Sequence, residues 1–381
     1  MEYLLYFISF IFTKLIIFNK NVSKVNFNRI LIVKLDHIGD VVTSLPSVYS
    51  IRKRFPDAVV TFLTGEWSKD VLKNNPYINN IEIYNSNRFN RERKNRKSII
   101  QRIRYLRSIF KKRYDLIAGL RDDWLTLIFS LIYFPKARVD RGTVRIKLKY
   151  ENTLGLIFKS EKNNKTIHEI DTNLKIAEMA GSEAIGEKKF IFLSEGERDW
   201  AEEFLSSKGL KEKKFVIISP GAKWKYRRWD TRNFALLADR IREKFGLEIL
   251  ISGSKGEVDT AEDMRVMMKE KGISVAGKID IRQTLSLLEK ALICITNDSG
   301  MVHLTSGLNI PVVALFGAQD PMKFGPWSDI NAVYHKKVEC FPCSQKKCKL
   351  KDNPCINLIE EDEVFSGVRE ILNSTQNVEV Q

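Results

Sequence analysis

The sequence has little cysteine, no long apolar run and fewer acidic than basic residues. Five cysteines in 381 residues are too few for a disulfide scaffold, which favours a reducing compartment. No basic start with a small-residue cleavage site marks a secretory signal. With 47 acidic against 63 basic residues, the net charge is +16. This excess indicates a polyanionic partner, which could be nucleic acid, an anionic membrane or a phosphorylated substrate.

Nucleic acid is the least favoured of these partners. The densest basic run, residues 88–113, lacks the interleaved aromatic residues that stack on bases, and no helix-turn-helix or zinc finger is evident. Apolar residues recur at helical spacing in its second half: Ile99, Ile100, Ile103, Leu106, Ile109 and Phe110. This spacing predicts an amphipathic helix with a cationic outer face. That face is either simply solvated or binds anionic lipid headgroups or the phosphates of a lipid-linked acceptor.

The N-terminus is strongly apolar, but its apolar stretch is short. Residues 4–18 are almost wholly apolar and aromatic, with an interruption at Lys14. A spanning helix needs about 20 such residues. We therefore expect residues 1–24 to form an interfacial, membrane-associating helix; a marginal transmembrane span and a helix packed on the protein itself are the alternatives. Lys20 and Lys24 would keep the body of the protein on the cytoplasmic side in either membrane arrangement.

The rest of the chain alternates short apolar runs with amphipathic segments, and the pattern restarts after Gly181. A length of 381 residues exceeds one comfortable core. The predicted fold is therefore α/β, with two Rossmann-like doubly wound domains facing a cleft, residues 25–185 and 186–360, and a C-terminal helix and tail over 361–381. Strands are predicted at 29–34, 58–64, 115–120, 215–219, 248–252, 274–276, 291–296 and 311–316. Helices are predicted at 41–55, 231–245, 257–271 and 281–290.

Ligands of such sheets bind beyond the carboxyl ends of the strands, which directs attention to the turns there. In the first turn, Gly39 lets the backbone turn sharply into a helix and places Asp40 at or just inside the helix start. Asp40 is either a carboxylate that projects into the cleft or a plain N-cap. Asp36 and His37 precede it, as surface turn residues or as catalysts.

Two turns of the second domain carry nucleotide-binding features. Residues 219–229 hold four cations and two tryptophans. The loop is either a solvated basic loop or a phosphate site in which Arg227 or Arg228 forms a bidentate fork. The turn at 252–257 resembles a nucleotide turn, where Glu257 would hydrogen-bond ribose hydroxyls, although its glycines also suit a simple turn.

The stretch from 294 to 327 is the most informative. A buried strand leads through Asn297, Asp298, Ser299 and Gly300 into a helix that ends near Gly307. Such a helix start offers backbone N–H groups and positive dipole to an anion, and His303 one turn later adds a donor. This arrangement suits a diphosphate.

Four cysteines form a C-x2-C-x4-C-x6-C cluster: Cys340, Cys343, Cys348 and Cys355. Four thiolates within this span could bind a structural zinc ion, although the spacing matches no common finger. Free or redox-sensitive thiols are the alternative. The fifth cysteine, Cys294, is expected to be an ordinary core residue.

Four blocks together resemble glycosyltransferase family 9, the family of the lipopolysaccharide heptosyltransferases. They are ILIVKLDHIGDVVTSLPSVYSIRKRFPDA, SPGAKWKYRRWDTRNFALLADRI, NDSGMVHLTSGLNIPVVALFGAQDP with FGPW, and the cysteine-rich tail. The resemblance implies a GT-B fold, with an N-terminal acceptor domain and a C-terminal nucleotide-sugar domain. It also implies inverting transfer without a metal ion.

The resemblance assigns roles to several residues. Asp40 matches the Gly-Asp carboxylate, the general base that takes the acceptor hydroxyl proton. The donor sugar and diphosphate are held by an Asp-Thr/Ser-Gly-x-x-His motif, matched by Asp298, Ser299, Gly300 and His303. Arg227 stands where many members carry Lys against the diphosphate, and Glu257 where an acidic residue meets the ribose. Lysines next to Arg227, such as Lys223, could help to stabilise the diphosphate. The chain departs from the family at Asp36, where members often carry Ser, and at Asp230, an expected N-cap where Pro is common.

We therefore expect a metal-independent transferase that moves a heptose or related sugar from an ADP- or other nucleotide-activated donor to a hydroxyl of lipopolysaccharide core or another lipid-linked glycan. The alternative is a catalytically silent protein that binds nucleotide sugar or anionic lipid. The enzyme is expected to be a monomer at the cytoplasmic face of the inner membrane, without a nucleic-acid partner. An aspartate with an ordinary pKa of about 4 is a weak base, so proton transfer would lag until the new C–O bond is forming.

Overall fold

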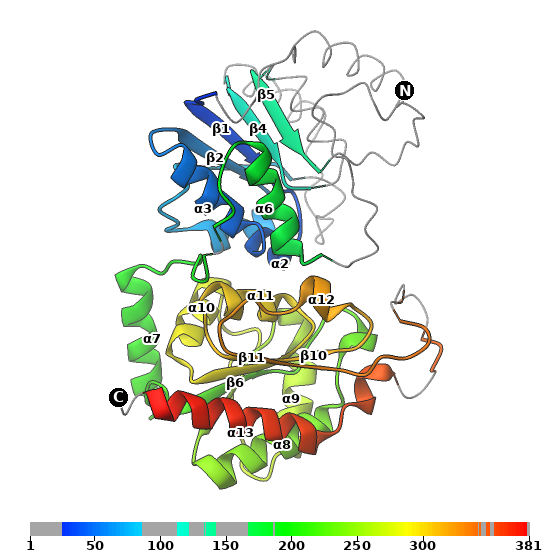
Figure 1. The fold of residues 1–381 in the computed structure, drawn as a ribbon. Helices are drawn as coiled ribbons and strands as arrows, with labels where there is room; N and C mark the ends of the chain where they lie inside the picture. The colour runs from blue at the N-terminus through cyan, green and yellow to red at the C-terminus, as the bar shows by residue number, and fades with distance from the viewer. Residues whose placement is uncertain are drawn as a thin grey trace. The chain divides into compact units, whose positions relative to one another are not determined.

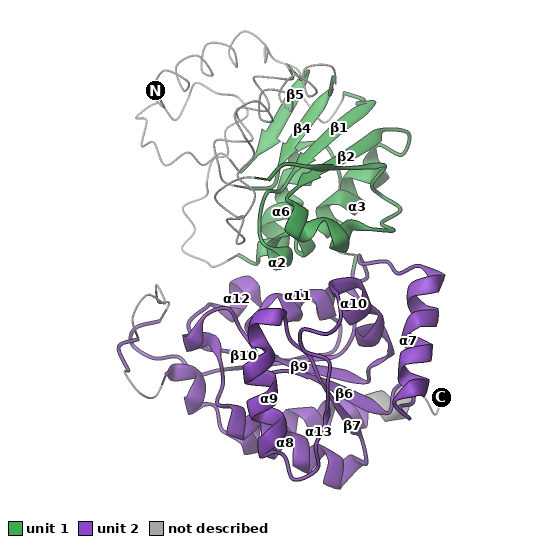
Figure 2. Cartoon of the chain, turned by 180° about the vertical axis from the view of Figure 1, so that it is seen from behind, with its two compact units in different colours: residues 1–187 green, residues 188–381 purple. Residues whose placement is uncertain are grey.

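The computed structural model describes residues 25–85, 113–121, 133, 135–141, 167–185, 187–341, 343, 348–350 and 354–378. The chain divides into two compact units, residues 1–187 and 188–381, named unit 1 and unit 2 (Figure 2). The predicted membrane-associating helix at 1–24 and the predicted amphipathic helix at 99–110 lie outside the described residues. Across the described ranges, no helix is both long and apolar enough to cross a bilayer.

Unit 1 is built on a five-stranded sheet with the order β3-β2-β1-β4-β5 (Figure 1). All of its paired strands run parallel. Its described elements are β1 (Arg29–Val33), α2 (Ile38–Val42), α3 (Leu45–Arg54), β2 (Val59–Thr64), the short helix η2 (Glu66–Leu72), β3 (Asn80–Ile83), β4 (Leu116–Gly119), β5 (Ala137–Asp140) and α6 (Glu169–Met179).

The central strand β1 explains why this sheet forms. Its sequence RILIV is apolar throughout because a parallel strand in the middle of a sheet is covered on both faces, and all but its first residue are buried. Val33, the last residue of β1, lies opposite Leu63 of β2 and Gly119 of β4. The first turn therefore leaves the sheet from its centre.

One predicted helix is in fact two. The prediction of a single helix over 41–55 was wrong, because α2 ends at Val42 and α3 begins at Leu45. Pro46 is the cause. It has no N–H to bond the carbonyl of Val42, and it is accommodated only in the first turn of a new helix.

Unit 2 is built on a six-stranded parallel sheet with the order β11-β10-β9-β6-β7-β8. Its elements are α7 (Glu195–Ser207), β6 (Phe215–Ser219), η3 (Lys225–Arg227), α8 (Thr231–Phe245), β7 (Glu248–Ile251), η4 (Lys255–Glu257), α9 (Val258–Met267), β8 (Ile273–Ser274), α10 (Ile281–Lys290), β9 (Ile293–Asn297), α11 (Gly300–Gly307), β10 (Val312–Phe316), α12 (Pro321–Phe324), β11 (Asn331–His335), η5 (Cys355–Leu358) and α13 (Glu361–Val378).

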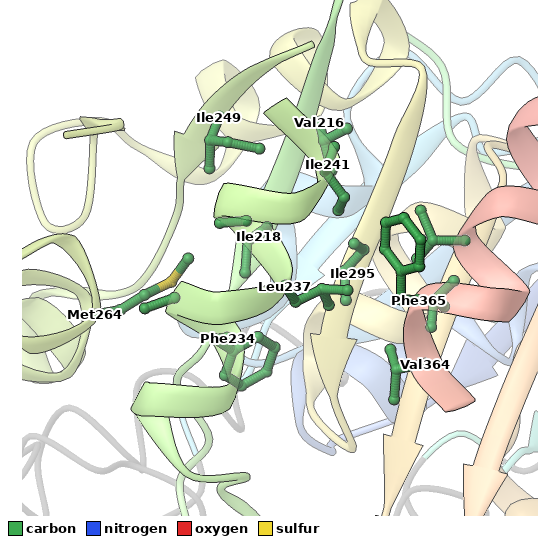
Figure 3. Close-up of a cluster of buried hydrophobic side chains, with 14 of the residues drawn as sticks. Val216, Ile218, Phe234, Leu237, Ile241, Ile249, Met264, Ile295, Val364 and Phe365 are labelled. Atoms are coloured by element: carbon green, nitrogen blue, oxygen red, sulfur yellow. The ribbon is translucent and has the colours of Figure 1, made fainter. Parts of the chain in front are cut away.

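The core of unit 2 is packed around α8. This helix buries Phe234, Leu237, Ala238 and Ile241, which share one face at helical spacing. Figure 3 shows Phe234, Leu237 and Ile241 of this face in one cluster with the strand residues Ile218 and Ile295, Met264 of α9, and Val364 and Phe365 of α13. The predicted bounds of α8 and of α10 are confirmed to the residue. Asp230, expected to be an N-cap, does cap α8 by accepting a hydrogen bond from Arg232 N.

Helix α9 is shorter than predicted. The prediction of helix over 257–271 was wrong at its end, since α9 stops at Met267 and the next residue has extended backbone. The chain must then turn tightly toward β8. Gly272 passes so close to β7 that a Cβ there would lie 2.9 Å from the carbonyl oxygen of Ile249.

Trp229 joins the loop after β6 to the core. Its side chain is 1% exposed, packs edge-to-face on Phe234 with ring centroids 5.0 Å apart, and donates from Nε1 to the Ile359 carbonyl at 2.9 Å. Trp224, in the same loop, is 46% exposed. The two tryptophans therefore form a matched pair for a stability experiment.

We predict that Trp229→Ala lowers the free energy of unfolding by about 3–5 kcal/mol, because it leaves a large cavity. Trp229→Phe should cost about 1–3 kcal/mol, since the ring is kept but the Ile359 carbonyl loses its donor. Trp224→Ala, the control, should change stability by less than about 0.5 kcal/mol. Urea unfolding followed by far-UV circular dichroism measures all three. Equal losses for the Trp229→Ala and Trp224→Ala variants would contradict the assignment.

Candidate active site

Both sheets have their topological switch point at the strand that leads into an unusual turn. In unit 1, β1 lies between β2 and β4, and in unit 2, β6 lies between β7 and β9. Successive crossovers lead away from the central strand in opposite directions there, which opens a crevice beyond the carboxyl ends of the two strands. The predicted turn at 34–40 follows β1, and the turns at 219–229 and 297–300 follow β6 and β9. The sequence-predicted residues thus gather at the two positions where such sheets bind ligands.

A buried lysine occupies the switch point of unit 1. Lys34, 1% exposed, directly follows β1, and its Nζ donates to the carbonyl of Leu120 beyond β4 at 2.7 Å. The same Nζ lies 3.6 Å from Glu169 and 3.9 Å from Asp36. Burial lowers the pKa of Lys34, as does the charge of Arg141, while Glu169 and Asp36 oppose the change. The lysine therefore joins the ends of β1 and β4, and two carboxylates lie within 4 Å of its Nζ.

Asp36 is fixed on both its side chain and its backbone. Its Oδ1 lies 2.9 Å from Nη1 of Arg121, which also donates to the Leu35 carbonyl at 2.8 Å. Its backbone carbonyl accepts a hydrogen bond from Nε1 of Trp67 at 2.7 Å. Arg121 follows β4, so this ion pair crosses the switch point a second time.

Asp40 is not the N-cap of its helix. The cap position of α2 is His37, whose side chain makes no capping bond, and Asp40 lies in the first turn. The N-cap interpretation is therefore wrong. The expected turn at Gly39 is also wrong, because α2 has already begun at Ile38 and Gly39 lies buried within it.

The basicity of Asp40 also differs from expectation. Burial, followed by the negative charge of Asp36, raises its pKa from 3.8 to about 7. Lys34 opposes the increase, whereas Glu169 and a hydrogen bond with the Asp36 side chain add to it. The expected pKa of about 4 is therefore wrong for this carboxyl group. Between pH 3.8 and 7 the folded protein binds a proton that the unfolded chain has lost, so this group makes the fold less stable as pH rises through that window.

Helix α6 contributes side chains that the sequence analysis missed. Glu169, its first residue, is buried and accepts from Arg141, which follows β5, at 2.5 Å. Arg141 also bonds Asn173, and Asn173 donates to the Thr43 carbonyl at 3.0 Å, in the break between α2 and α3. An acidic residue in a first helical turn is ordinary, and β5 itself was not predicted, so no local signal marked these residues.

In unit 2, an amide side chain makes the hydrogen bond across the switch point that Lys34 makes in unit 1. Asn297, the last residue of β9, is fully buried, and its Nδ2 donates to the Pro220 carbonyl after β6 at 2.7 Å. Its Oδ1 accepts from the backbone N–H of Trp229 at 3.1 Å. Asn297 therefore holds both ends of the basic loop 220–229 beside the start of α11. The sequence analysis treated it only as part of the turn.

Asp298 and Arg227 were both predicted to bind the donor. In the structure their side chains form an ion pair with each other. Nη1 of Arg227 lies 3.3 Å from Oδ2 of Asp298, whose residue is 4% exposed. Burial raises the pKa of Asp298 to about 6, and the charge of Arg227 opposes the change. Arg228 instead donates from Nε to the Ala222 carbonyl at 2.7 Å, which fixes the loop.

The start of α11 lies next to this pair. Ser299 is the N-cap and accepts from Met301 N at 3.2 Å. Gly300 is exposed, and a Cβ there would meet no atom within 4 Å. His303 lies one turn later and is partly exposed. The helix start predicted for anion binding is therefore formed, with open space beside Gly300.

Lys223 and Glu257 have different surroundings. Lys223 is exposed, with its Nζ 5.4 Å from the ring centroid of Trp224. Oε2 of Glu257 accepts from both the backbone and the hydroxyl of Ser254, at 2.8 and 2.7 Å, as a capping box. The carboxylate also packs on Gly221, where an added Cβ would lie 2.7 Å from Oε1. Glu257 thus joins the turn after β7 to the basic loop.

The four clustered cysteines, Cys340, Cys343, Cys348 and Cys355, all lie within the described residues. Within the described ranges, which include all four, no group of three or more His, Cys, Asp or Glu side chains is placed to hold a metal ion. The zinc prediction therefore has no structural support. Cys355 is buried and packs on Gly317 after β10. Cys294 is a core residue as expected, and burial raises the pKa of its thiol to about 12.

Comparison with known proteins identifies the family. The model of glycosyltransferase family 9 (heptosyltransferase) matches residues 102–353. Lipooligosaccharide heptosyltransferase 2 of Campylobacter jejuni is 31% identical over 158 residues, which are 40% of this chain and 49% of the relative. Lipopolysaccharide heptosyltransferase 3 of Escherichia coli is 22% identical over 299 residues, 76% of this chain and 84% of the relative. This chain thus spans about half the length of the Campylobacter relative.

Solved structures agree with the fold. A family 9 glycosyl transferase from Veillonella parvula has a TM-score of 0.76 at 21% identity, covering 93% of this chain and all of that one. The E. coli ADP-heptose lps heptosyltransferase II has a TM-score of 0.68 at 19% identity, covering 91% and 99%. These likenesses confirm the predicted α/β architecture with two parallel sheets. Since its family model covers most of the chain, this protein belongs to glycosyltransferase family 9.

Proposed function

We propose that this protein is an inverting glycosyltransferase that moves a heptose or related sugar from an ADP-activated donor to a hydroxyl group of lipopolysaccharide core or another lipid-linked glycan. The observation that carries the proposal is Asp40. Its carboxyl group lies at a switch point, caps no helix and has a pKa raised to about 7. The raised pKa makes the fold lose stability as the pH rises from 3.8 to about 7. Perturbed carboxyls of this kind concentrate at functional sites. The names of the relatives supply the sugar class.

Asp40 is proposed as the general base. Above pH 7 its carboxylate takes the proton from the acceptor hydroxyl while the oxygen bonds to the anomeric carbon of the donor sugar. The bond from that carbon to the diphosphate breaks, and the nucleoside diphosphate leaves with the electron pair. Attack opposite the leaving group inverts the anomeric configuration. A base with a pKa near the working pH suits this step better than an ordinary aspartate.

Unit 2 is proposed to bind the donor. The start of α11, at Ser299 and Gly300, would receive the diphosphate, with His303 and Arg227 as further donors. Each well-placed donor of this kind stabilises the leaving group by roughly 2.7–4 kcal/mol, which is how the reaction would proceed without a metal ion. Arg227 would share its guanidinium between the diphosphate and Asp298, to which it already pairs.

Two finer assignments complete the donor site. Lys223 adds charge at the exposed rim of the basic loop. Glu257 would meet the ribose through Oε1, because Oε2 is occupied by Ser254. The adenine base rests on the name of the similar E. coli structure, an ADP-heptose transferase. A thermal-shift panel of nucleoside diphosphates tests it, and a stronger response to another base would change the donor.

The acceptor side is proposed to act at a membrane. Residues 1–24 and the basic run 88–113 would hold the enzyme peripherally on the cytoplasmic leaflet, where a lipid-linked acceptor is presented. Each cation near an anionic surface contributes roughly 1 kcal/mol.

We predict that Asp40→Asn lowers sugar transfer by at least about 10²-fold while ADP affinity stays within about twofold, because the base is lost and the donor site is untouched. The same variant should melt above the wild type at about pH 8, since an uncharged amide avoids the burial of a carboxylate. Transfer of heptose from ADP-heptose, titration calorimetry with ADP and thermal melting measure these effects. Equal loss of transfer and ADP binding would mean that Asp40 is structural.

We predict that Arg227→Ala weakens ADP binding at least about tenfold and lowers transfer by about 10²–10³-fold, because a charged donor to the diphosphate is lost. Arg232→Ala is the matched control. That arginine is exposed at the start of α8 and pairs with Asp230 at 2.7 Å, so its removal should leave ADP affinity unchanged. Calorimetry on both variants decides. An unaltered affinity in Arg227→Ala removes this residue from the site.

We predict that replacing the Lys and Arg residues of 88–113 with Gln and deleting residues 1–24 abolishes co-sedimentation with vesicles rich in phosphatidylglycerol. The physical reason is the loss of both the apolar anchor and the cationic face. Lys208→Gln with Lys211→Gln, two exposed lysines of unit 2, is the charge control and should sediment like the wild type. Undiminished binding of the deleted variant would reject the membrane proposal.

A further inference from the structure

One side chain bonds both ends of the basic loop 220–229 of unit 2. Nδ2 of Asn297 donates to the carbonyl of Pro220 at 2.7 Å, and Oδ1 accepts from the backbone N–H of Trp229 at 3.1 Å. An amide offers a donor and an acceptor on separate atoms, whereas a carboxylate only accepts and an apolar side chain does neither. Asn297 therefore closes the loop at two points that are not neighbours in the sequence.

The position of Asn297 is set by the sheet. It is the last residue of β9, which pairs with β6 on one side and with β10 on the other, and it is fully buried. The next backbone N–H, that of Asp298, donates to the carbonyl of Leu315 in β10 at 2.8 Å. The side chain of Asn is short, so a fixed backbone leaves its amide little freedom. Both ends of the loop are thus held in place relative to the sheet.

The loop brings its arginine to the residue that follows Asn297. Nη1 of Arg227 lies 3.3 Å from Oδ2 of Asp298, which is buried. Nε of Arg228 donates to the Ala222 carbonyl at 2.7 Å, which joins the two arms of the loop. Because Asp298 continues from β9 while Arg227 belongs to the loop, their pairing depends on where the loop lies relative to β9. Asn297 fixes that relation.

The chain around the loop also has supports that do not involve Asn297. The indole N–H of Trp229 donates to the Ile359 carbonyl at 2.9 Å, and the backbone N–H of Asp230 donates to Oδ1 of Asn357 at 3.1 Å. These bonds hold the Trp229 end on the core when the amide is removed. Loss of the Asn297 amide should therefore loosen the loop without unfolding unit 2.

We propose that Asn297 is a positioning residue for the donor: its amide holds the basic loop so that Arg227 lies beside Asp298 and the start of α11 before the diphosphate binds. This inference rests on the donor site proposed in unit 2. A loop that is already ordered loses little conformational entropy when a ligand binds, whereas a loose loop must be ordered at that moment. A merely structural amide would lower the stability of the fold and leave the ADP affinity of the folded protein unchanged.

The test is a double-mutant cycle on ADP affinity, measured by titration calorimetry on folded protein well below its melting temperature. Asn297→Ala should weaken ADP binding about tenfold, because the loop is then ordered only on binding. Arg227→Ala should weaken it at least about tenfold. The double variant should bind within about threefold of Arg227→Ala, because Asn297 acts through the arginine that is already missing.

Asn173→Ala is the matched control. Asn173 is also fully buried, donates to the Thr43 carbonyl at 3.0 Å and accepts from Arg141 at 2.5 Å, but it lies in unit 1. Its replacement should lower the melting temperature, as Asn297→Ala does, and leave ADP affinity within about twofold of the wild type. If Asn297→Ala does not fold, as judged by circular dichroism, Asn297→Ser takes its place in the cycle.

A folded Asn297→Ala variant with wild-type ADP affinity overturns the inference, and so does an equal loss of affinity in Asn173→Ala. Losses that multiply in the double variant also overturn it, since Asn297 would then act independently of Arg227. If Arg227→Ala itself binds ADP like the wild type, the donor site of the proposed function fails instead. The two failures are therefore distinguishable.

Discussion

Each unit depends on one buried side-chain hydrogen bond across its switch point. Where neighbouring parallel strands diverge, their last backbone groups lose their ladder partners, and a buried group without a partner is costly. Lys34 bonds the Leu120 carbonyl in unit 1, and Asn297 bonds the Pro220 carbonyl in unit 2. These two bonds join the strand ends next to Asp40 in unit 1 and next to Arg227 and the start of α11 in unit 2.

Lys34 and Asn297 both supply a hydrogen bond to an unpaired carbonyl at a strand end, but they differ in charge. Asn297 is neutral, so it fixes the basic loop 220–229 without adding a charge beside the cations of that loop. Lys34 is a buried cation, which is tolerated only with carboxylates close by. Burial, and after it the charges of Asp36 and Glu169 near this lysine, raise the pKa of Asp40, while Lys34 itself opposes the increase.

Local sequence predicted the elements that have strong local signals. The apolar spacing of residues 231–245 and the capping aspartate before them predicted both ends of α8 correctly, and the run RILIV predicted β1. The edge strands β3 and β11 were missed because NIEI and NAVYH are short and partly polar, as edges often are. The helix over 41–55 was drawn too long because a proline near a helix start can either join a helix or divide two, and only packing decides between them.

The sequence by itself determined the two α/β repeats, the family, and the identity of Asp40, Arg227 and Asp298 as the residues to examine. Only the tertiary structure decided what surrounds them. Glu169 and Arg141 lie more than 100 positions from Asp40 along the chain, yet the crossovers to β5 and α6 bring them to the same carboxyl end of the sheet. Burial and Coulomb energy depend on distance in space and not on distance in sequence. A pKa of about 7 for Asp40, and the pairing of Arg227 with Asp298, therefore could not be read from the chain alone.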